Sequence, residues 1–144
     1  MRKFPLYLIA VAALAAPASA AEKVGRRTSS PERMLEELRG LESAEEEAVA
    51  AAAAHPLGST ENPVRVGGPA GARAYLARLR CADGTRPKVG ASAPAGVGAF
   101  GSVVEAFPLD CGAAAPGKFP LVVDIYHEEH VEDRAPAGFR IDSK

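Results

Sequence analysis

The sequence predicts an α+β fold: a small disulfide-bridged domain with a short antiparallel sheet, preceded by an N-terminal helix rich in Ala and Glu. The chain of 144 residues contains only two cysteines, and its apolar segments after residue 58 are short and rich in Val, Leu and Phe, which is typical of strands. The Ala- and Glu-rich stretch lies before residue 57. With 6% aromatic residues and no Trp, the chain can bury only a modest core, so a covalent bridge would add useful stability.

The first 20 residues have the three parts of a secretory signal. Met1-Arg2-Lys3 supplies positive charge, residues 4–16 are apolar, and Pro17-Ala18-Ser19-Ala20 offers a small-x-small cleavage site. An uncleaved membrane anchor is the alternative, but the apolar run is short for a bilayer span. We therefore expect residues 1–20 to be a signal peptide and the product to be periplasmic or secreted, without a membrane span after cleavage.

Two segments separate this signal from the domain. Residues 21–29 are polar and lack an apolar period, which predicts a disordered leader. Residues 30–57 are predicted to form a helical arm, because Ser30 can cap a helix whose first residue is Pro31. A narrow apolar stripe at helical spacing indicates that this arm packs loosely or stands apart, and its members are Met34, Leu35, Leu38 and Leu41. The arm either docks a partner or simply covers the domain.

Residues 58–144 are predicted to form the α+β domain. Residues 119–126 are apolar on both faces, which indicates a central strand, whereas Pro108 should place its own strand at an edge or mark a bulge. Residues 85–101, rich in Gly and Pro, are predicted to be a long loop. The other expected elements are a short helix at 70–79 and strands at 63–66, 103–109 and 139–141.

The loop contains a literal G-x-G-x-x-G match at residues 96–101. A dinucleotide site of this type needs a strand before the glycines and a helix after them. Here a loop precedes the match and a strand is predicted to follow it. The pattern therefore predicts a glycine-rich turn, and no nucleotide cofactor.

Cys81 and Cys111 are predicted to form the disulfide of the domain. The alternatives are a reactive pair or metal ligands, but the separation is far from a C-x-x-C spacing. An exported chain also meets an oxidising environment, which permits a structural bridge.

Four short segments resemble a group of known proteins. Residues 75–84, residues 96–98, Asp124-Ile125-Tyr126-His127 and residues 136–139 are similar to uncharacterised small exported proteins of proteobacteria. The resemblance covers about Gly58 to Ile141 and leaves out the helical arm. It implies a stand-alone secreted domain and carries no activity, substrate, cofactor or catalytic residue.

One segment has the composition of a metal site. Asp124, His127 and His130 are candidate ligands for a divalent transition metal. The zincin pattern H-E-x-x-H fails, because Val131 stands where its second His would be. In a strand, residues three apart point to opposite faces, so joint ligation requires the chain to turn at His127. The alternative is an acidic loop in which Asp124, Tyr126 and His127 form structural hydrogen bonds.

Charge is distributed unevenly along the domain. Residues 65–88 contain six Arg or Lys against the single acid Asp83, a local charge of +5, and the acids that follow Asp124 are their natural intramolecular complement. Without that pairing, the basic segment could meet anionic lipid or polysaccharide. Export argues against nucleic acid as a partner.

These patterns favour a non-enzymatic function. No Ser-His-Asp or Cys-His set can be assembled from the sequence, which argues against a hydrolase. We therefore expect a binding or envelope-interaction domain whose partner is an envelope protein or a polysaccharide. The alternative is a metal-binding protein or metal-dependent enzyme that uses Asp124, His127 and His130.

Overall fold

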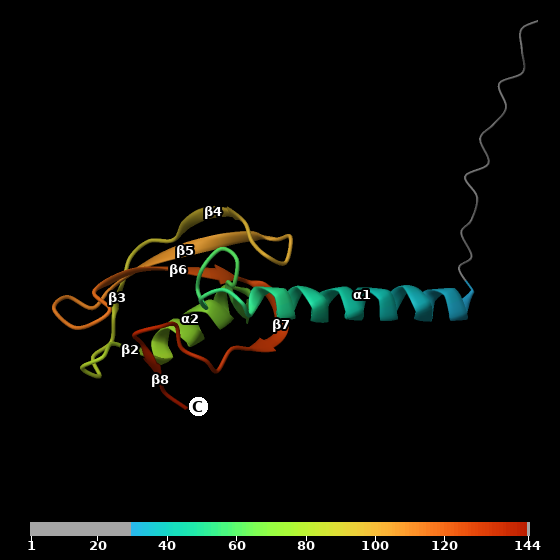
Figure 1. Cartoon of the computed structure of the whole chain (residues 1–144). Coiled ribbons are helices and arrows are strands. Elements are labelled where there is room, and N and C mark those ends of the chain that lie inside the picture. The colour runs from blue at the N-terminus through green and yellow to red at the C-terminus, as the bar shows by residue number, and fades with distance from the viewer. Residues whose placement is uncertain (1–29, 144) are drawn as a thin grey trace, which may run out of the picture.

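Figure 1 shows the computed structural model of the chain, which describes residues 30–143. The predicted signal (1–20) and leader (21–29) lie outside these residues. One long helix projects from a domain that combines a sheet with a shorter helix. The elements are α1 (Pro31–Ala52), β1 (Val64–Gly67), α2 (Gly68–Arg78), β2 (Leu79–Arg80), β3 (Lys88–Val89), β4 (Ala93–Val97), β5 (Val103–Asp110), β6 (Lys118–Asp124), β7 (Tyr126–Val131) and β8 (Arg140–Ile141).

Helix α1 begins where the sequence predicts. The Ser30 hydroxyl accepts a hydrogen bond from the Arg33 amide at 3.4 Å, and Pro31 occupies the first turn. The helix ends at Ala52, which is its only buried residue. None of the helices in the described part of the chain is both long enough and apolar enough to cross a membrane.

The main sheet has six strands in the order β3-β5-β6-β1-β7, with β4 also paired to β5. Strand β6 lies in the middle, as predicted, and pairs antiparallel with β5 and parallel with β1. A separate two-stranded sheet joins β2 to β8. The α+β class is confirmed, but the prediction of a short antiparallel sheet is wrong, because this sheet is larger and includes one parallel pair.

The prediction of a long loop at residues 85–101 is also wrong. This segment contains β3 and β4, which both pair antiparallel with β5. Both strands are almost wholly exposed, so their side chains show no alternation between core and solvent that a sequence pattern could reveal. The glycine-rich turn is present after β4, where the Gly101 amide donates to the Gly98 carbonyl at 3.1 Å.

Two prolines lie opposite each other in the centre of the β5–β6 pair. Pro108 of β5 pairs in register with Pro120 of β6. The Pro108 carbonyl accepts a hydrogen bond from the Gly90 amide, so the backbone polar groups of Pro108 face away from β6. Pro108 therefore removes no hydrogen bond from this pair. It falls between the stretches of β5 that β3 and β4 cover, and β5 is flanked on both sides rather than forming an edge.

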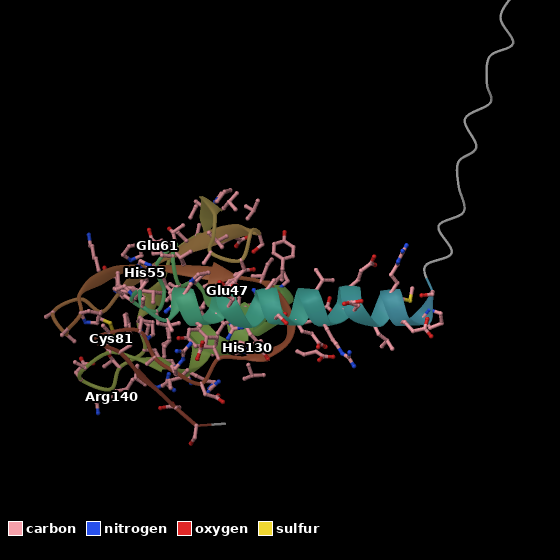
Figure 2. The ribbon with its side chains drawn as sticks, turned by 45° about the vertical axis from the view of Figure 1, so that its right-hand side comes forward. Glu47, His55, Glu61, Cys81, His130 and Arg140 are labelled. Carbon is pink, nitrogen blue, oxygen red and sulfur yellow. A yellow bond between two sulfur atoms is a disulfide. The ribbon has the colours of Figure 1, made fainter. Side chains whose placement is uncertain are left out.

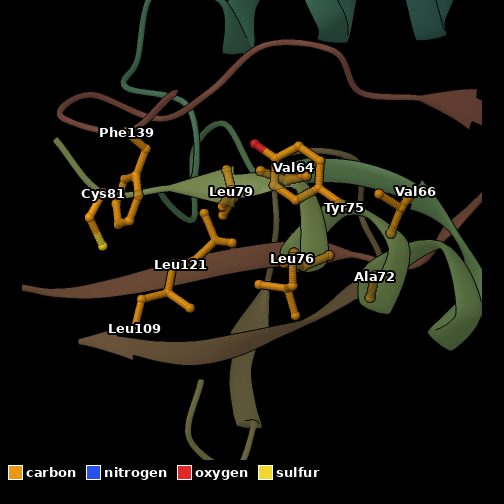
Figure 3. Close-up of a cluster of buried hydrophobic side chains, with 11 residues drawn as sticks. Val64, Val66, Ala72, Tyr75, Leu76, Leu79, Cys81, Leu109, Leu121 and Phe139 are labelled. Carbon is orange, nitrogen blue, oxygen red and sulfur yellow. The ribbon is translucent and has the colours of Figure 1, made fainter. Parts of the chain in front are cut away.

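The core lies between the sheet and α2 (Figure 3). Residues of α2 and β2 pack against β1, β5 and β6, and Phe139 covers one end. Cys81 and Cys111 form the disulfide at the edge of this core, with their Cα atoms 5.8 Å apart, as predicted. The buried members of the cluster are Val64, Val66, Ala72, Tyr75, Leu76, Leu79, Cys81, Leu109, Leu121, Val123 and Phe139.

Part of the predicted charge complement is formed. Arg78 pairs with Asp133 at 2.9 Å, and Arg80 pairs with Asp142. These contacts join the end of α2 and β2 to the chain that follows β7. They use two of the six basic side chains of residues 65–88.

Candidate functional site

A groove of about 890 Å³ lies between α1 and β7, and we call it the α1–β7 groove. One wall is the middle of α1. The opposite wall combines β7, the glycine-rich turn and Arg65 of β1. The lining residues are Leu41, Ala44, Glu45 and Ala48 on one side and Arg65, Ala99, Phe100, Gly101 and Tyr126–His130 on the other.

An irregularity in β7 shapes the second wall. Val66 of β1 pairs with Val131 of β7, but the next residue, Gly67, pairs with Tyr126, five residues earlier in β7. The four residues between have no partner in β1, so the chain bulges. The bulge lies directly on Gly67, where an added Cβ would sit 2.6 Å from the Glu128 carbonyl oxygen. This departure from regular strand geometry lets both histidines line the same groove.

Asp124 lies behind the groove and is fully buried at the end of β6. Its Oδ1 accepts from the Tyr126 amide at 3.1 Å, and its Oδ2 accepts from the Ser102 hydroxyl. His127 Nε2 lies 3.3 Å from the same Oδ2, within ion-pair range but not aligned for a hydrogen bond. A buried carboxylate needs such partners, because burial without them is costly.

The Ser102, Asp124 and His127 set does not make a nucleophile. The carboxylate stands between the other two, so the serine hydroxyl donates to Asp124 rather than to the imidazole. A catalytic serine needs its hydroxyl bonded to the base, with the carboxylate behind that base. The geometry therefore agrees with structural hydrogen bonding around Asp124.

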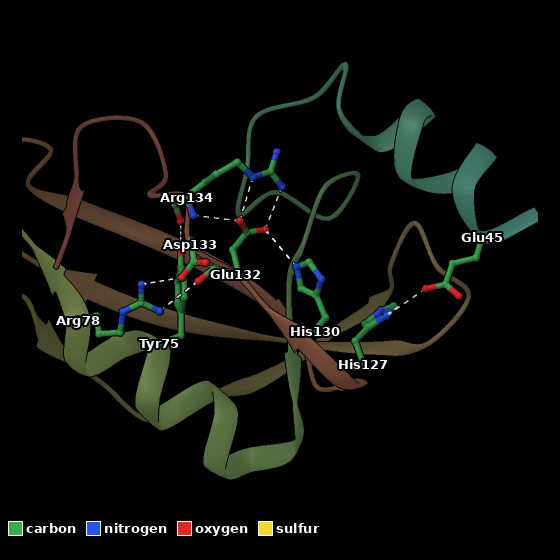
Figure 4. Close-up of polar contacts among 8 residues, drawn as sticks. All are labelled: Glu45, Tyr75, Arg78, His127, His130, Glu132, Asp133 and Arg134. Atoms are coloured by element: carbon green, nitrogen blue, oxygen red, sulfur yellow. Dashed lines mark hydrogen bonds and ion pairs between the residues drawn. The ribbon is translucent and has the colours of Figure 1, made fainter. Parts of the chain in front are cut away.

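His127 joins the domain to α1. Its Nδ1 lies 4.0 Å from Glu45 Oε1 on the helix (Figure 4), and its side chain is only 13% exposed. The Phe100 ring meets the His127 imidazole edge to face, with centroids 5.1 Å apart. The Arg65 guanidinium lies over the Phe100 ring, 5.3 Å from its centroid. Arg65, Phe100, His127 and Glu45 thus form a continuous contact across the groove.

His130 belongs to a second polar cluster, drawn in Figure 4. Its Nε2 lies 3.7 Å from Glu132, which Arg134 holds through two side-chain hydrogen bonds of 2.9 Å. Burial and the nearby Arg65 lower the pKa of His130, and Glu132 only partly opposes them. Burial would raise the pKa of Glu132, but the Arg134 bonds outweigh it and lower that pKa. The neutral imidazole and the charged carboxylate are therefore favoured in the folded state.

The three predicted metal ligands divide between these clusters. Asp124 and His127 come together, whereas His130 lies beside Glu132. Within residues 30–143, no three His, Cys, Asp or Glu side chains are placed so that they could hold one metal ion. Both oxygens of Asp124 already have partners, so this side chain is better placed to orient His127 than to bind a metal. Metal binding stays a prediction.

Several residues of the site have no signal in the sequence. Glu45, Arg65 and the neighbouring pair Phe100 and Ser102 come from three separate segments and meet only because the chain folds. Ser102 follows the glycine-rich turn, and that turn is what places it beside Asp124. Sequence spacing could identify the 124–130 segment but not these partners.

The helix wall of the groove continues into solvent. Figure 2 shows the side chains of α1 projecting on the part that leaves the domain. The large apolar side chains on this part are more than half exposed: Met34 56%, Leu35 55%, Leu38 52% and Leu41 68%. Four such side chains on one helix form an apolar surface that is unusual for water contact.

Comparison with known proteins leaves the family open. The chain matches no protein-family model, and neither a curated protein nor a solved structure is significantly similar to it. The resemblance to exported proteobacterial proteins therefore stays a prediction.

Proposed function

We propose that the protein is a non-enzymatic binding domain of the bacterial envelope, periplasmic or secreted, which holds a partner through α1. The observation that carries this proposal is the exposed apolar stripe on α1: Met34, Leu35, Leu38 and Leu41. The Cys81–Cys111 bridge is in keeping with an oxidising compartment.

The energetics of α1 support the same function. Most of the stability of a protein helix comes from packing of its apolar face rather than from helix propensity. In α1 only Ala52 is buried, so the 22-residue helix gains little from its own domain. A partner that covered the stripe would supply the missing packing, at about 1.5–3 kcal/mol for each fully buried Leu or Met side chain.

Deleting residues 21–57 should leave the domain folded and abolish partner capture. The domain should fold because α1 contributes nothing to the main core cluster, and Leu57, which packs against that cluster, is only partly buried. We expect the thermal midpoint of residues 58–144 to stay within a few degrees of that of the chain from residue 21. Capture is measured by cross-linking in the host envelope, with the Leu38→Gln, Leu41→Gln double variant as a full-length test. Unfolding of the truncated chain, or capture unchanged in the double variant, would reject this function.

A metal-binding function is the second candidate, supported by the Asp124–His127 contact. A carboxylate lies beside one nitrogen of many metal-ligating His side chains, and in His127 the other nitrogen, Nδ1, faces the Glu45 carboxylate, which would be the second ligand. Replacing His127 and His130 together by Ala should then abolish Zn²⁺ uptake in equilibrium dialysis, with circular dichroism showing that the domain stays folded. Uptake equal to that of the unaltered chain would remove this candidate.

A further inference from the structure

The negative charge of the chain is concentrated on α1. Helix α1 carries seven glutamates and two arginines, hence a net charge of −5. Residues 53–144 carry ten acidic and ten basic side chains and are neutral. The acidity of α1 is therefore a property of this one surface and not of the whole domain.

Part of this charge lies beside the apolar stripe of α1, and one of these glutamates, Glu45, also lines the α1–β7 groove. At 100° per residue, Glu42, Glu45 and Glu46 lie on the same side of the helix as Leu38. These three glutamates also line a hollow of about 450 Å³ beside Arg65. Across the groove, Glu128 and Glu129 are exposed on the β7 bulge.

Most of these carboxylates have no internal partner. Glu45 has only the 4.0 Å contact with His127, and the other four form no ion pair with another residue of the described range 30–143. The acidic side chains beside the stripe and on the β7 bulge are therefore free to meet positive charge from outside. Arg65 is the one basic side chain among the residues that line the groove, apart from the two histidines.

Apolar side chains lie between the two acidic borders, together with Arg65 and His127. Leu41, Ala44 and Ala48 face Phe100 and Tyr126, and Tyr126 is 65% exposed. Towards the N-terminus the same surface continues to Met34. Met34 to Ala48 spans about 21 Å, the length of roughly four helical turns.

The charge and the shape oppose the other occupants. A second copy would place −5 against −5 along α1, and anionic lipid or polysaccharide would meet the same repulsion. Addition of a strand to the β7 edge is opposed by the bulge and by Glu128 and Glu129, which are features that protect edge strands. An apolar stripe with acidic borders is complementary to a helix that is apolar on one face and basic on the other.

We propose that the α1–β7 groove and the stripe beyond it bind a cationic amphipathic helix of a partner protein. The partner's Leu or Met side chains lie along Leu38 and Leu41, and its Lys or Arg side chains meet Glu42 and Glu46 on α1 and Glu128 on β7. This inference rests on the proposed binding function and names the chemistry of the partner.

The first test uses a fluorescently labelled Leu/Lys peptide of about 18 residues with apolar side chains at helical spacing. Its affinity for the chain from residue 21 is measured by anisotropy. We expect saturable binding that weakens as salt is raised, because the contacts at the rim are exposed ion pairs. A peptide of the same composition in scrambled order and a Leu/Glu peptide should not bind.

Matched variants then locate the site. Leu38→Gln with Leu41→Gln should raise the Kd about tenfold or more. Glu42→Gln with Glu46→Gln should raise it about fivefold. Glu36→Gln with Glu47→Gln removes the same charge from the opposite face of α1 and should change it less than about twofold.

The outcomes separate this inference from the function on which it rests. If the peptide does not bind, or if both glutamate double variants lose the same affinity, the inference of a cationic helix is overturned. Capture in the envelope that depends on the stripe would still support the proposed function. The inference is also overturned if sedimentation shows a dimer and the Leu38→Gln, Leu41→Gln double variant is monomeric, because the occupant is then a second copy of the chain. Capture that does not depend on Leu38 and Leu41 rejects the function itself.

Discussion

Replacing Cys81 and Cys111 together by Ala is expected to lower the free energy of unfolding by about 3–4 kcal/mol, mainly because the unfolded chain gains freedom. The bridge closes a sequence separation of 30 residues that includes β3, β4 and β5. Its Cys81 end is fully buried in the core cluster, next to Leu79. For a chain with so few aromatic residues, this is a large part of the stability expected of a domain.

Urea unfolding followed by circular dichroism measures this effect. The double variant and the unaltered chain in excess reductant should lose similar amounts, and both should show a larger slope with urea because their unfolded states are more expanded. A loss below about 1 kcal/mol in the variant would contradict a bridge that restricts the unfolded chain. Figure 2 places Cys81 away from the projecting part of α1, so peptide binding by the folded fraction should not change.

Local signals explain which parts of the fold were predictable. The start of α1 follows from Ser30 and Pro31, whose effects reach only a few residues along the chain. Strand β6 was predictable because its second half, residues 121–124, is buried on both faces and residues 121–123 are continuously apolar. The pairing of Cys81 with Cys111 followed from the absence of any other cysteine.

The rest depended on contacts between distant segments. Strands β3 and β4 are held by hydrogen bonds to β5 rather than by burial, so their composition resembles that of a loop. The parallel pairing of Val64 with Val123 brings two far segments together and leaves no local trace. For the same reason, the 124–130 segment was found from its composition, but its contact with Glu45 was not.

Asp124→Ala is expected to lower the free energy of unfolding by about 2–3 kcal/mol. The substitution leaves the Ser102 hydroxyl and the Tyr126 amide without their acceptor and removes the carboxylate beside His127. Because Asp124 is fully buried, water does not readily replace these bonds. Asp124→Asn keeps the shape and one acceptor oxygen, so it should lose less than Asp124→Ala.

Asp110→Ala is the matched control for this prediction. The Asp110 Oδ1 also accepts an amide two residues ahead, from Gly112 at 2.7 Å, but this hydrogen bond is exposed to water. We expect the control to cost less than about 1 kcal/mol in urea unfolding. If the Asp124 and Asp110 variants lose equal amounts of unfolding free energy, Asp124 does not organise the β6–β7 connection.

Asp124→Ala should also change the environment of His127. The Asp124 carboxylate lies beside the imidazole that contacts α1, so NMR of the imidazole nitrogens should show shifted His127 signals in this variant.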